Sequence, residues 1–181
     1  GNGTFRDVTT AAGLTSHQPG ISATFVDIDR DGYLDLFVAN YLRFDPAVKL
    51  PAGTTARVAY PGPLSYEPEF NLLYRNRGNG TFEDISEKAG IRVPGHRAMS
   101  VTAFDYDGDG DDDLYVSNDG TPNLLFQNDG HGRFTEVALK AGVGFNQFGA
   151  ADGSMGAAVA DATGDGLPDI FVTRFGNASF Y

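Results

Sequence analysis

Apolar residues in this chain fall in short runs, and acidic turns separate them. Two of these runs, Leu36-Phe37-Val38-Ala39 and Ile170-Phe171-Val172-Thr173, are apolar on both faces. Strands with two apolar faces are typical of sheets that lie between neighbouring sheets. Residues 78–129, the second of three repeated units, are predicted to form four short strands, at 81–85, 99–105, 113–117 and 123–127.

Two sequence segments recur in step with these strands. The opening Gly1-Asn2-Gly3-Thr4-Phe5 returns at 78–82 and, with substitutions, at 130–134. Each copy is followed by Ala-Gly and an aliphatic residue, and an Asn-led strand precedes both internal copies, at 71–74 and 123–126. The unit is about fifty residues long, a period typical of solenoids, propellers and arrays.

We therefore predict an all-β fold of β-propeller-type four-stranded blades, in about three repeats with calcium loops between strands. These form one continuous repeat domain, with repeat 1 at 1–77, repeat 2 at 78–129 and repeat 3 at 130–181. Propellers typically close with four to eight blades, so three repeats cannot form a ring alone. The domain is expected to be part of a larger propeller or assembly.

Repeat 1 carries an insertion at about 43–69 that contains five of the nine prolines. Pro and Gly at that density exclude a regular element and predict an ordered, extended surface loop. Its aromatic residues either cover a neighbouring blade or form a contact surface, and they are Tyr41, Phe44, Tyr60 and Tyr66.

Three acidic loops join the predicted strands, each with side-chain oxygens at positions 1, 3, 5 and 9 and glycine at position 6. Side chains at this spacing can point at one calcium ion, the glycine permits a sharp turn, and position 7 contributes its main-chain carbonyl. The predicted calcium ligands are Asp27, Asp29, Asp31, Tyr33 and Asp35 in loop 1, Asp105, Asp107, Asp109, Asp111 and Asp113 in loop 2, and Asp161, Thr163, Asp165, Leu167 and Asp169 in loop 3.

These loops differ from an EF-hand, which needs a bidentate Glu at position 12 between two helices, because Val38 in an apolar run occupies that position. Asp-Gly clusters also form plain turns. However, four Asp side chains in one loop repel one another without a cation. We therefore predict Ca²⁺ as the cofactor, about three ions in all, with weaker binding in loop 3 because Thr163 replaces an aspartate.

The formal net charge of −11 argues against partners that are nucleic acids or anionic membrane surfaces. Hydrophobic residues make up 41% of the chain, enough for a packed core, and no apolar run approaches the length of a membrane helix. Cysteine is absent, so no disulfide holds the fold. Calcium loops of modest affinity fill where free calcium is high, which favours an extracellular or cell-surface location.

The acidic loops resemble the FG-GAP/VCBS repeats of integrin-alpha-type β-propellers. Asn-Leu-Leu-Tyr-Arg-Asn at 71–76, leading into 78–85 and Ala-Gly-Ile at 89–91, is more specifically similar to the ASPIC/UnbV and cartilage-acidic-protein branch. The resemblance covers nearly the whole chain, including Tyr-Pro-Gly-Pro at 60–63. It implies an extracellular, calcium-stabilised propeller that serves adhesion or scaffolding. Thr163 departs from the pattern, as does Ala59, near which relatives often carry cysteine.

The two ends of the chain fall within the same repeated hairpin. The chain is therefore either an excerpt from a longer propeller protein or a subunit that associates head to tail, with 177–181 of one copy pairing with 4–8 of the next. Exposed strand edges template such pairing, and a head-to-tail contact gives a ring or a filament.

Three sequons mark candidate glycosylation sites at Asn2, Asn79 and Asn177. Asn-Gly is also a preferred hairpin turn, and Asn177 occupies a repeat position with a structural role.

Catalytic residues are not predicted. The three histidines, His17, His96 and His131, lie at different repeat positions, and Ser154 is not in a nucleophile elbow. A polysaccharide-acting enzyme is the least favoured function, with Arg43, Asp45 and Glu69 as its only candidates. We predict a non-catalytic extracellular calcium-binding module with a structural, adhesive or filament-forming role. The alternative is a propeller that binds an extracellular glycan or protein.

Overall fold

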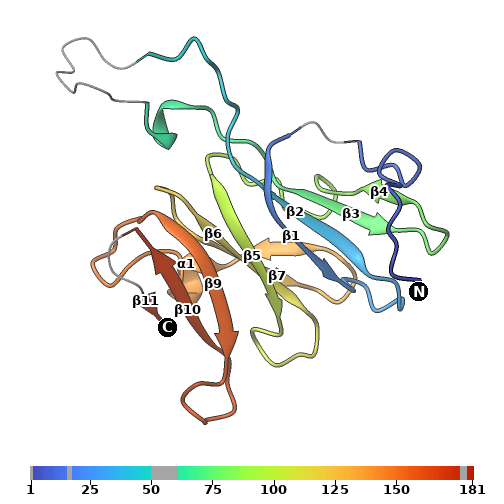
Figure 1. Ribbon diagram of the computed structural model, residues 1–181. Helices are drawn as coiled ribbons and strands as arrows, with labels where there is room; N and C mark the ends of the chain where they lie inside the picture. Colours follow the sequence, from blue (N-terminus) through green and yellow to red (C-terminus); the bar gives the residue numbers. More distant parts are fainter. Residues whose placement is uncertain (1, 16–17, 50–60, 176–178) are drawn as a thin grey trace.

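The computed structural model describes residues 2–15, 18–49, 61–175 and 179–181, and these form three antiparallel sheets (Figure 1). The sheets have the strand orders β1-β2-β3-β4, β5-β6-β7-β8 and β9-β10-β11. The strands are β1 (Gly20–Val26), β2 (Asp35–Asn40), β3 (Leu72–Asn76), β4 (Phe82–Asp84), β5 (Ala98–Phe104), β6 (Asp113–Asn118), β7 (Leu124–Asn128), β8 (Phe134–Glu136), β9 (Ser154–Ala160), β10 (Asp169–Arg174) and β11 (Ser179–Phe180). The predicted all-β fold with propeller-like blades is confirmed.

Sheets and sequence repeats are offset by one strand. By sequence, β4 and β8 open the second and third repeats. In the structure, however, β4 pairs with β3 in the first sheet and β8 pairs with β7 in the second sheet. The reason is the Asn79-Gly80 turn, which forms a tight hairpin that the amide of Arg77 closes by donating to the carbonyl of Thr81 at 2.9 Å. Each repeat therefore contributes its first strand to the sheet before it.

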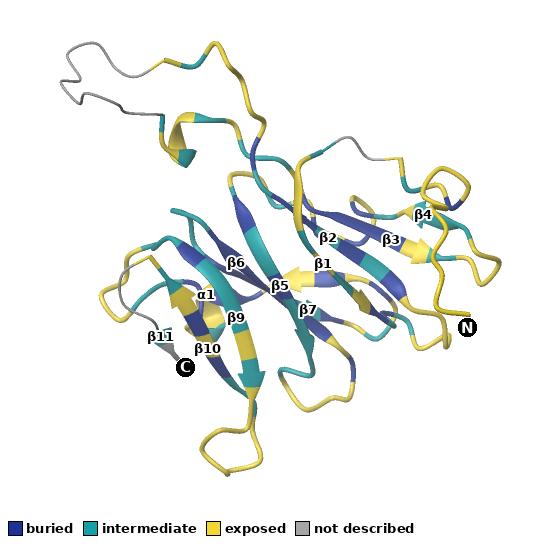
Figure 2. Ribbon diagram, in the orientation of Figure 1, coloured by how far each residue is buried: buried dark blue, intermediate teal, exposed yellow. Residues whose placement is uncertain are grey.

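The second sheet is the most deeply buried part of the molecule (Figure 2). Every residue of its strand β6 is buried, and the side chains alternate between two apolar clusters. Leu114 and Val116 pack with residues of the first sheet, while Tyr115 packs with residues of the third. This strand has the two buried faces that are expected of a sheet with a neighbour on each side.

The outer faces of the first and third sheets differ from the sequence prediction. Phe37 of β2 is fully buried, but its neighbour Leu36 is only partly buried. Phe171 of β10 is 43% exposed. Two buried faces were the wrong prediction for these runs, because among the described residues no further sheet packs against either outer face.

Turns that contain the Ala-Gly dipeptide contact the outer strands of the first two sheets. The amide of Phe82 donates to the carbonyl of Ala12 at 2.8 Å, and the amide of Phe134 donates to the carbonyl of Ala89 at 2.8 Å. Gly90 has a φ of 83°, and a Cβ there would lie 2.7 Å from the carbonyl oxygen of Phe134. Glycine alone fits this close approach. The Ala89-Gly90 turn, which follows β4 of the first sheet, is thus a contact with the second sheet.

Part of the insertion covers the second sheet, which is one of the two alternatives from the sequence. The buried Arg97 donates to the carbonyls of Pro63 at 2.9 Å and Tyr66 at 2.6 Å. The Pro63–Ser65 segment forms a short 3₁₀ turn, η1. The Phe44 and Tyr66 rings pack together with centroids 5.6 Å apart, and Phe44 stays exposed. Pro51, Ala59 and Tyr60 lie outside the described residues.

The two ends of the chain differ in structure. Residues 4–8 are exposed and form no strand, whereas 179–180 form β11 on the open side of β10. The segments that match 4–8 in sequence, β4 and β8, are strands because β3 and β7 supply their hydrogen bonds. Within the described ranges, no helix has the length and apolar character needed to cross a membrane.

Candidate metal centre

The three acidic loops occupy equivalent places in the three sheets. They connect β1 to β2, β5 to β6 and β9 to β10, and Figure 1 shows them at the opposite end of the sheets from the insertion. Each loop therefore follows the first strand of a sheet and leads directly into the second. This arrangement agrees with strands on both sides of each loop, as the sequence predicts, and not with the helices of an EF-hand.

Loop 1 brings three carboxylates together. Oxygens of Asp27, Asp29 and Asp35 lie within 4.8 Å of one another. The Asp27 carboxylate accepts hydrogen bonds from the amides of Asp31 at 3.1 Å and Gly32 at 3.0 Å, which fixes the loop's turn. One oxygen of Asp29, Oδ1, is buried and has no hydrogen-bond partner. A buried carboxylate oxygen without a partner is costly, and a cation at the loop centre would remove that cost.

Loop 2 forms a matching cluster from a different trio. Oxygens of Asp105, Asp107 and Asp109 lie within 4.8 Å of one another. The Asp105 carboxylate accepts from the amides of Gly108 at 2.8 Å and Gly110 at 2.9 Å. The donor set of both loops consists of oxygen atoms alone, which suits a hard cation such as calcium.

The carboxylate at position 9 has a second role that the sequence does not reveal. Asp35 accepts from the amides of Ile28 at 3.1 Å and Asn76 at 2.7 Å. Asp113 likewise accepts from Tyr106 at 2.8 Å and Asn128 at 2.7 Å. In the first and second sheets this side chain connects the acidic loop to the end of the third strand.

Electrostatics at position 9 also favour a cation. Burial raises the pKa of Asp35, although two amide hydrogen bonds oppose the change and the charges of Asp29 and Asp31 add to it. Burial raises the pKa of Asp113 to about 6, again against two amide hydrogen bonds and with a contribution from Asp107 and Asp109. Each carboxylate is therefore hard to ionise without positive charge nearby. A calcium ion would supply that charge.

Loop 3 differs from the other two, as Thr163 predicts. Asp161 accepts from the amides of Gly164, Asp165 and Gly166, and Asp169 accepts from Ala162 and Thr163. In the loop as described, no three carboxylates converge.

We expect loop 3 to bind calcium about tenfold more weakly than loops 1 and 2, because fewer carboxylates face the ion. The test is calcium titration of three full-length variants, each of which retains one loop while alanine replaces position 1 of the other two. Those position 1 residues are Asp27, Asp105 and Asp161. If loop 3 binds calcium most tightly, calcium affinity in these loops does not follow the number of carboxylates, and the prediction is wrong.

Position 7 was predicted to contribute only its main-chain carbonyl. The side chains there are consistent with that role: Leu167 carries no side-chain oxygen, and Tyr33 lies against Gly78, where a Cβ would be 2.8 Å from its ring. Asp111 forms an ion pair with Arg30 of loop 1, with Nε and Oδ1 2.6 Å apart. Its carboxylate is thus already paired.

Two functional side chains on the third strands were missed from the sequence. Arg75 of β3 forms ion pairs with Asp29 and with Asp31, and Gln127 of β7 donates to Asp107. Arg75 and Gln127 occupy the same place in the repeated Asn-Leu-Leu-x-x-Asn segment, and that equivalence was the available signal. These side chains orient carboxylates at position 3 of their loops.

Comparison with known proteins follows from this geometry. A family model described as FG-GAP-like repeat matches residues 1–38, 58–116 and 105–172. The chain belongs to this FG-GAP-like repeat family. All three acidic loops lie inside the matched segments, so the resemblance seen in the sequence is confirmed.

Individual relatives agree with the family match. The chain is 30% identical over 166 residues to Cartilage acidic protein 1 of Mus musculus and of Homo sapiens, which covers 91% of this chain and 22% of each relative. It is 32% identical over 73 residues to Cartilage acidic protein 1 of Xenopus tropicalis, which covers 39% of this chain and 11% of that relative. The FG-GAP-like chain therefore spans about a fifth of the mouse and human relatives.

The predicted glycosylation sites have structural roles where they are described. The Oδ1 atoms of Asn2 and Asn79 accept hydrogen bonds from the amide and hydroxyl of Thr4 and Thr81, with amide distances of 3.1 and 3.0 Å. Both asparagines thus stabilise the turns in which they lie, and both are exposed. Asn177 lies outside the described residues. Glycosylation stays a prediction for all three.

Proposed function

We propose that this chain is a non-catalytic, extracellular module whose propeller blades calcium stabilises. The observation that carries the proposal is loop 1, where three carboxylates converge and the buried Oδ1 of Asp29 has no partner. Loop 2, one sheet further along, also brings three carboxylates together. Four or more oxygens at this spacing are the ligand set that calcium prefers.

Calcium would act here through the connection between each loop and its sheet. Asp27, Asp29, Asp31 and Asp35 would hold the ion in loop 1 with the carbonyl of Tyr33, and loop 2 would use its equivalent residues. When bound, the ion supplies positive charge that offsets the repulsion among these carboxylates. The hydrogen bonds of the position 9 carboxylates then hold the loop to the third strand. Ions that bind the native loops and not the unfolded chain stabilise the fold by mass action.

Several observations support an extracellular setting with a structural or adhesive role. Sites of this ligand count are filled at the calcium concentrations found outside cells. The relatives that match most of this chain carry the name Cartilage acidic protein 1. The acidic net charge of −11 agrees with a solvated extracellular protein.

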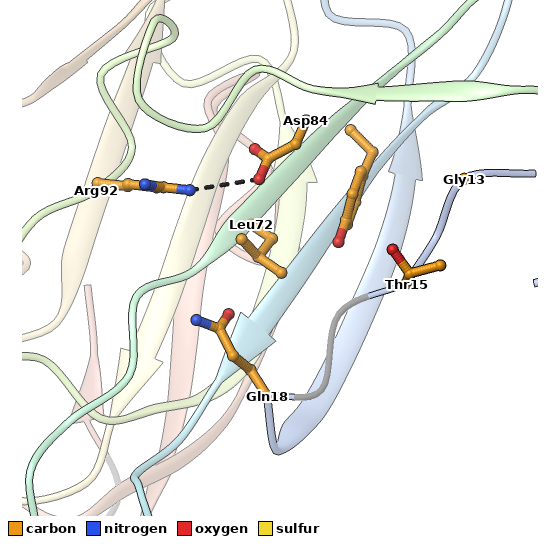
Figure 3. A pocket seen from close by; sticks show the side chains of 7 residues that line it. Gly13, Thr15, Gln18, Leu72, Asp84 and Arg92 are labelled. Carbon is orange, nitrogen blue, oxygen red and sulfur yellow. Dashed lines mark hydrogen bonds and ion pairs between the residues drawn. The ribbon is translucent and has the colours of Figure 1, made fainter. Parts of the chain in front are cut away.

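The partners of the candidate polar side chains support a non-catalytic role. The pocket in Figure 3 is lined by Gly13, Thr15 and Leu72 among others, and its two charged residues, Asp84 and Arg92, form an ion pair at 3.3 Å. Of the three candidates for a polysaccharide enzyme, Arg43 pairs with Glu69 at 2.8 Å and Asp45 caps a turn. Ser154 is buried and His96 contacts the carbonyl of Pro122.

The test of the proposed function is thermal unfolding of the chelator-treated protein with added calcium or magnesium. We expect millimolar calcium to raise the midpoint by several degrees or more, because calcium bound at a hundredfold above its Kd contributes about 2.7 kcal/mol per site. Magnesium should do less, since it demands a stricter octahedral geometry than a nine-residue loop provides. An unchanged midpoint in calcium would contradict the proposal.

Self-association through terminal strands is a second candidate, which the edge of the third sheet supports. Among the described residues, the edge strand β11 pairs only with β10, whereas the matching strands β3 and β7 each pair with a further outer strand. The sequence of those outer strands recurs at residues 4–8, which are exposed and form no strand. We propose that 4–8 of one copy adds to β11 of another, so that copies join head to tail as a filament or ring.

Light scattering in millimolar calcium tests this association on the full chain. We expect large particles that dissolve when a chelator is added, and a monomer after deletion of residues 1–8. Phe5→Asp is the matched point variant, since it keeps the chain length and places a charge where β4 and β8 carry Phe82 and Phe134. A chain that is monomeric before any change would rule out head-to-tail association.

Binding of an extracellular protein is supported by one further observation. A groove of about 500 Å³ lies between the insertion and the second and third sheets. Its walls include the exposed apolar side chains of Leu64 and Phe175 together with Asp119. Apolar walls suit a protein side chain better than a glycan, whose hydroxyls need many polar contacts. If the chain binds a protein ligand saturably and the Leu64→Asp variant does not, this role is supported. If the chain instead binds a glycan and the variant still binds it, this role is contradicted.

A further inference from the structure

Arg30 has a backbone conformation that its side chain does not favour. It lies at position 4 of loop 1 with a φ of 57°, and among the described residues no other non-glycine residue has a positive φ. Loops 2 and 3 carry Gly108 and Gly164 at this position, with φ values of 78° and 77°. The left-handed conformation is thus a property of the loop, and arginine there costs about 1 kcal/mol relative to glycine. A strained residue at such a place points to a role of its side chain.

The Arg30 side chain reaches loop 2 of the neighbouring sheet. Its Nε lies 2.6 Å from Oδ1 of Asp111, and its terminal nitrogen lies 3.5 Å from the carbonyl oxygen of Asp109. The Asp111 side chain is 10% exposed, so the ion pair lies at a largely buried carboxylate. Gly110 permits this approach, because a Cβ there would lie 3.0 Å from the Arg30 guanidinium.

A second set of contacts connects the same two loops. The Asn128 side-chain amide of β7 donates to the carbonyl of Ile28 in loop 1 at 2.9 Å. The main-chain amide of the same Asn128 donates to Asp113 at position 9 of loop 2. Gly132 lies against the Ile28 side chain, because a Cβ added at Gly132 would be 3.1 Å from Cδ1 of Ile28. Loop 1 is therefore attached to residues that also fix the geometry of loop 2.

We propose that Arg30 is a positioning residue that couples the calcium sites of loops 1 and 2, so that filling loop 1 raises the affinity of loop 2. This inference rests on the proposed function. Calcium in loop 1 would fix residues 27–35, and with them the backbone from which Arg30 extends. The guanidinium then holds Asp111, whose main-chain carbonyl is the position 7 ligand of loop 2. A loop that is already in its binding conformation binds with less loss of entropy.

Simple charge repulsion predicts the opposite sign. Arg30 is a cation beside loop 2, so its removal would tighten calcium binding there if charge alone mattered. If Arg30 instead positions Asp111, whose carbonyl is the position 7 ligand, its removal would weaken calcium binding in loop 2. The direction of the change therefore separates positioning from electrostatics.

The chain contains its own comparison. Loops 2 and 3 have Gly108 and Leu167 where loops 1 and 2 have Arg30 and Asp111, so this ion pair has no equivalent between them. The occupancy of loop 2 should accordingly have little effect on loop 3. Coupling in the FG-GAP-like repeat is thus expected between one pair of neighbouring loops and not between the other.

The experiment measures the calcium affinity of loop 2 in the full chain, with loop 1 intact or disabled by Asp27→Ala. The backbone amide signal of Gly110 in NMR reports loop 2, because that amide donates to Asp105 inside the loop. With Arg30 present, disabling loop 1 is expected to weaken loop 2 by about fivefold to tenfold, within the usual range of coupling between sites. In Arg30→Gly, loop 2 should be weakened by the same factor, and disabling loop 1 should have no further effect.

Arg30→Gly relieves backbone strain, so it is expected to fold, and midpoints measured in chelator check this. Arg92→Gly is the control, since it removes another arginine ion pair away from loop 2 and should leave the affinity of loop 2 unchanged. A purely structural role of Arg30 would move the midpoint but not the dependence of loop 2 on loop 1. If Arg30→Gly leaves that dependence intact, or tightens loop 2, the coupling proposal alone is overturned. If no loop binds millimolar calcium, the proposed function fails and the coupling with it.

Discussion

Replacing Asp113 with alanine is expected to destabilise the protein by about 2–4 kcal/mol even without calcium. The Asp113 carboxylate is buried and accepts hydrogen bonds from the amides of Tyr106 and Asn128. Alanine leaves both donors without an acceptor, at a cost of about 1–3 kcal/mol each. Part of this cost is offset because alanine also removes an ionised carboxylate that is unfavourable in a buried position, as the raised pKa of Asp113 indicates. Urea unfolding in chelator measures the change.

The matched control for this prediction is Asp109→Ala in the same loop. Asp109 is exposed, and its carboxylate accepts from the amide of Asp111 within the loop. We expect this variant to lose calcium binding in loop 2 while its stability in chelator changes by less than about 1 kcal/mol. Equal destabilisation by Asp113→Ala and Asp109→Ala in chelator would show that position 9 has no structural role of its own.

Gly90→Ala is expected to destabilise the protein by about 2–4 kcal/mol. The added Cβ would meet the carbonyl oxygen of Phe134 at 2.7 Å, so the backbones of two neighbouring sheets would have to separate. Alanine at a φ of 83° adds strain of about 1 kcal/mol. The hydrogen bond between Ala89 and Phe134 would also weaken. Thermal or urea unfolding in saturating calcium measures the loss.

Gly80→Ala separates strain from close approach. Gly80 has a φ of 84°, nearly that of Gly90, and a Cβ there would meet nothing within 4 Å. This control should lose only about 1 kcal/mol. If both variants lose the same amount, the contact between the turn and β8 does not contribute to the packing of the sheets.

Much of the architecture could be predicted from the sequence because the signals are local and repeated. The spacing within each acidic loop specifies a turn between two strands, and apolar runs specify the strands themselves. Asn79-Gly80 specifies the hairpin between β3 and β4. Each of these depends on residues that are close together in the chain.

Features that depend on neighbouring sheets were not predictable in the same way. Phe171 is apolar and forms part of a strand, but its exposure depends on whether another sheet covers it. The short helix α1 (Ala138–Ala141) replaces the plain turn that precedes the Ala-Gly dipeptide in the other repeats.

Within the candidate site, the pattern of calcium ligands could be predicted from the sequence, but the side chains that hold those ligands in place could not. Positions 1, 3, 5 and 9 follow from spacing alone. Arg75 and Gln127 act on the loops from strands that lie far along the chain, so only their equivalent places in the repeat connect them. The Arg30–Asp111 ion pair joins two different sheets and has no local signal beyond an arginine at a position where the other loops have glycine.

Calorimetric titration of the chelator-treated full chain with calcium tests the central claim most directly. The proposed structure of the loops predicts two tighter sites, assigned to loops 1 and 2, and one weaker site in loop 3. Asp105→Ala should remove one of the tighter sites and leave the other two. A folded protein that takes up no calcium at millimolar concentration, or whose uptake is unchanged by Asp27→Ala and Asp105→Ala together, would contradict it.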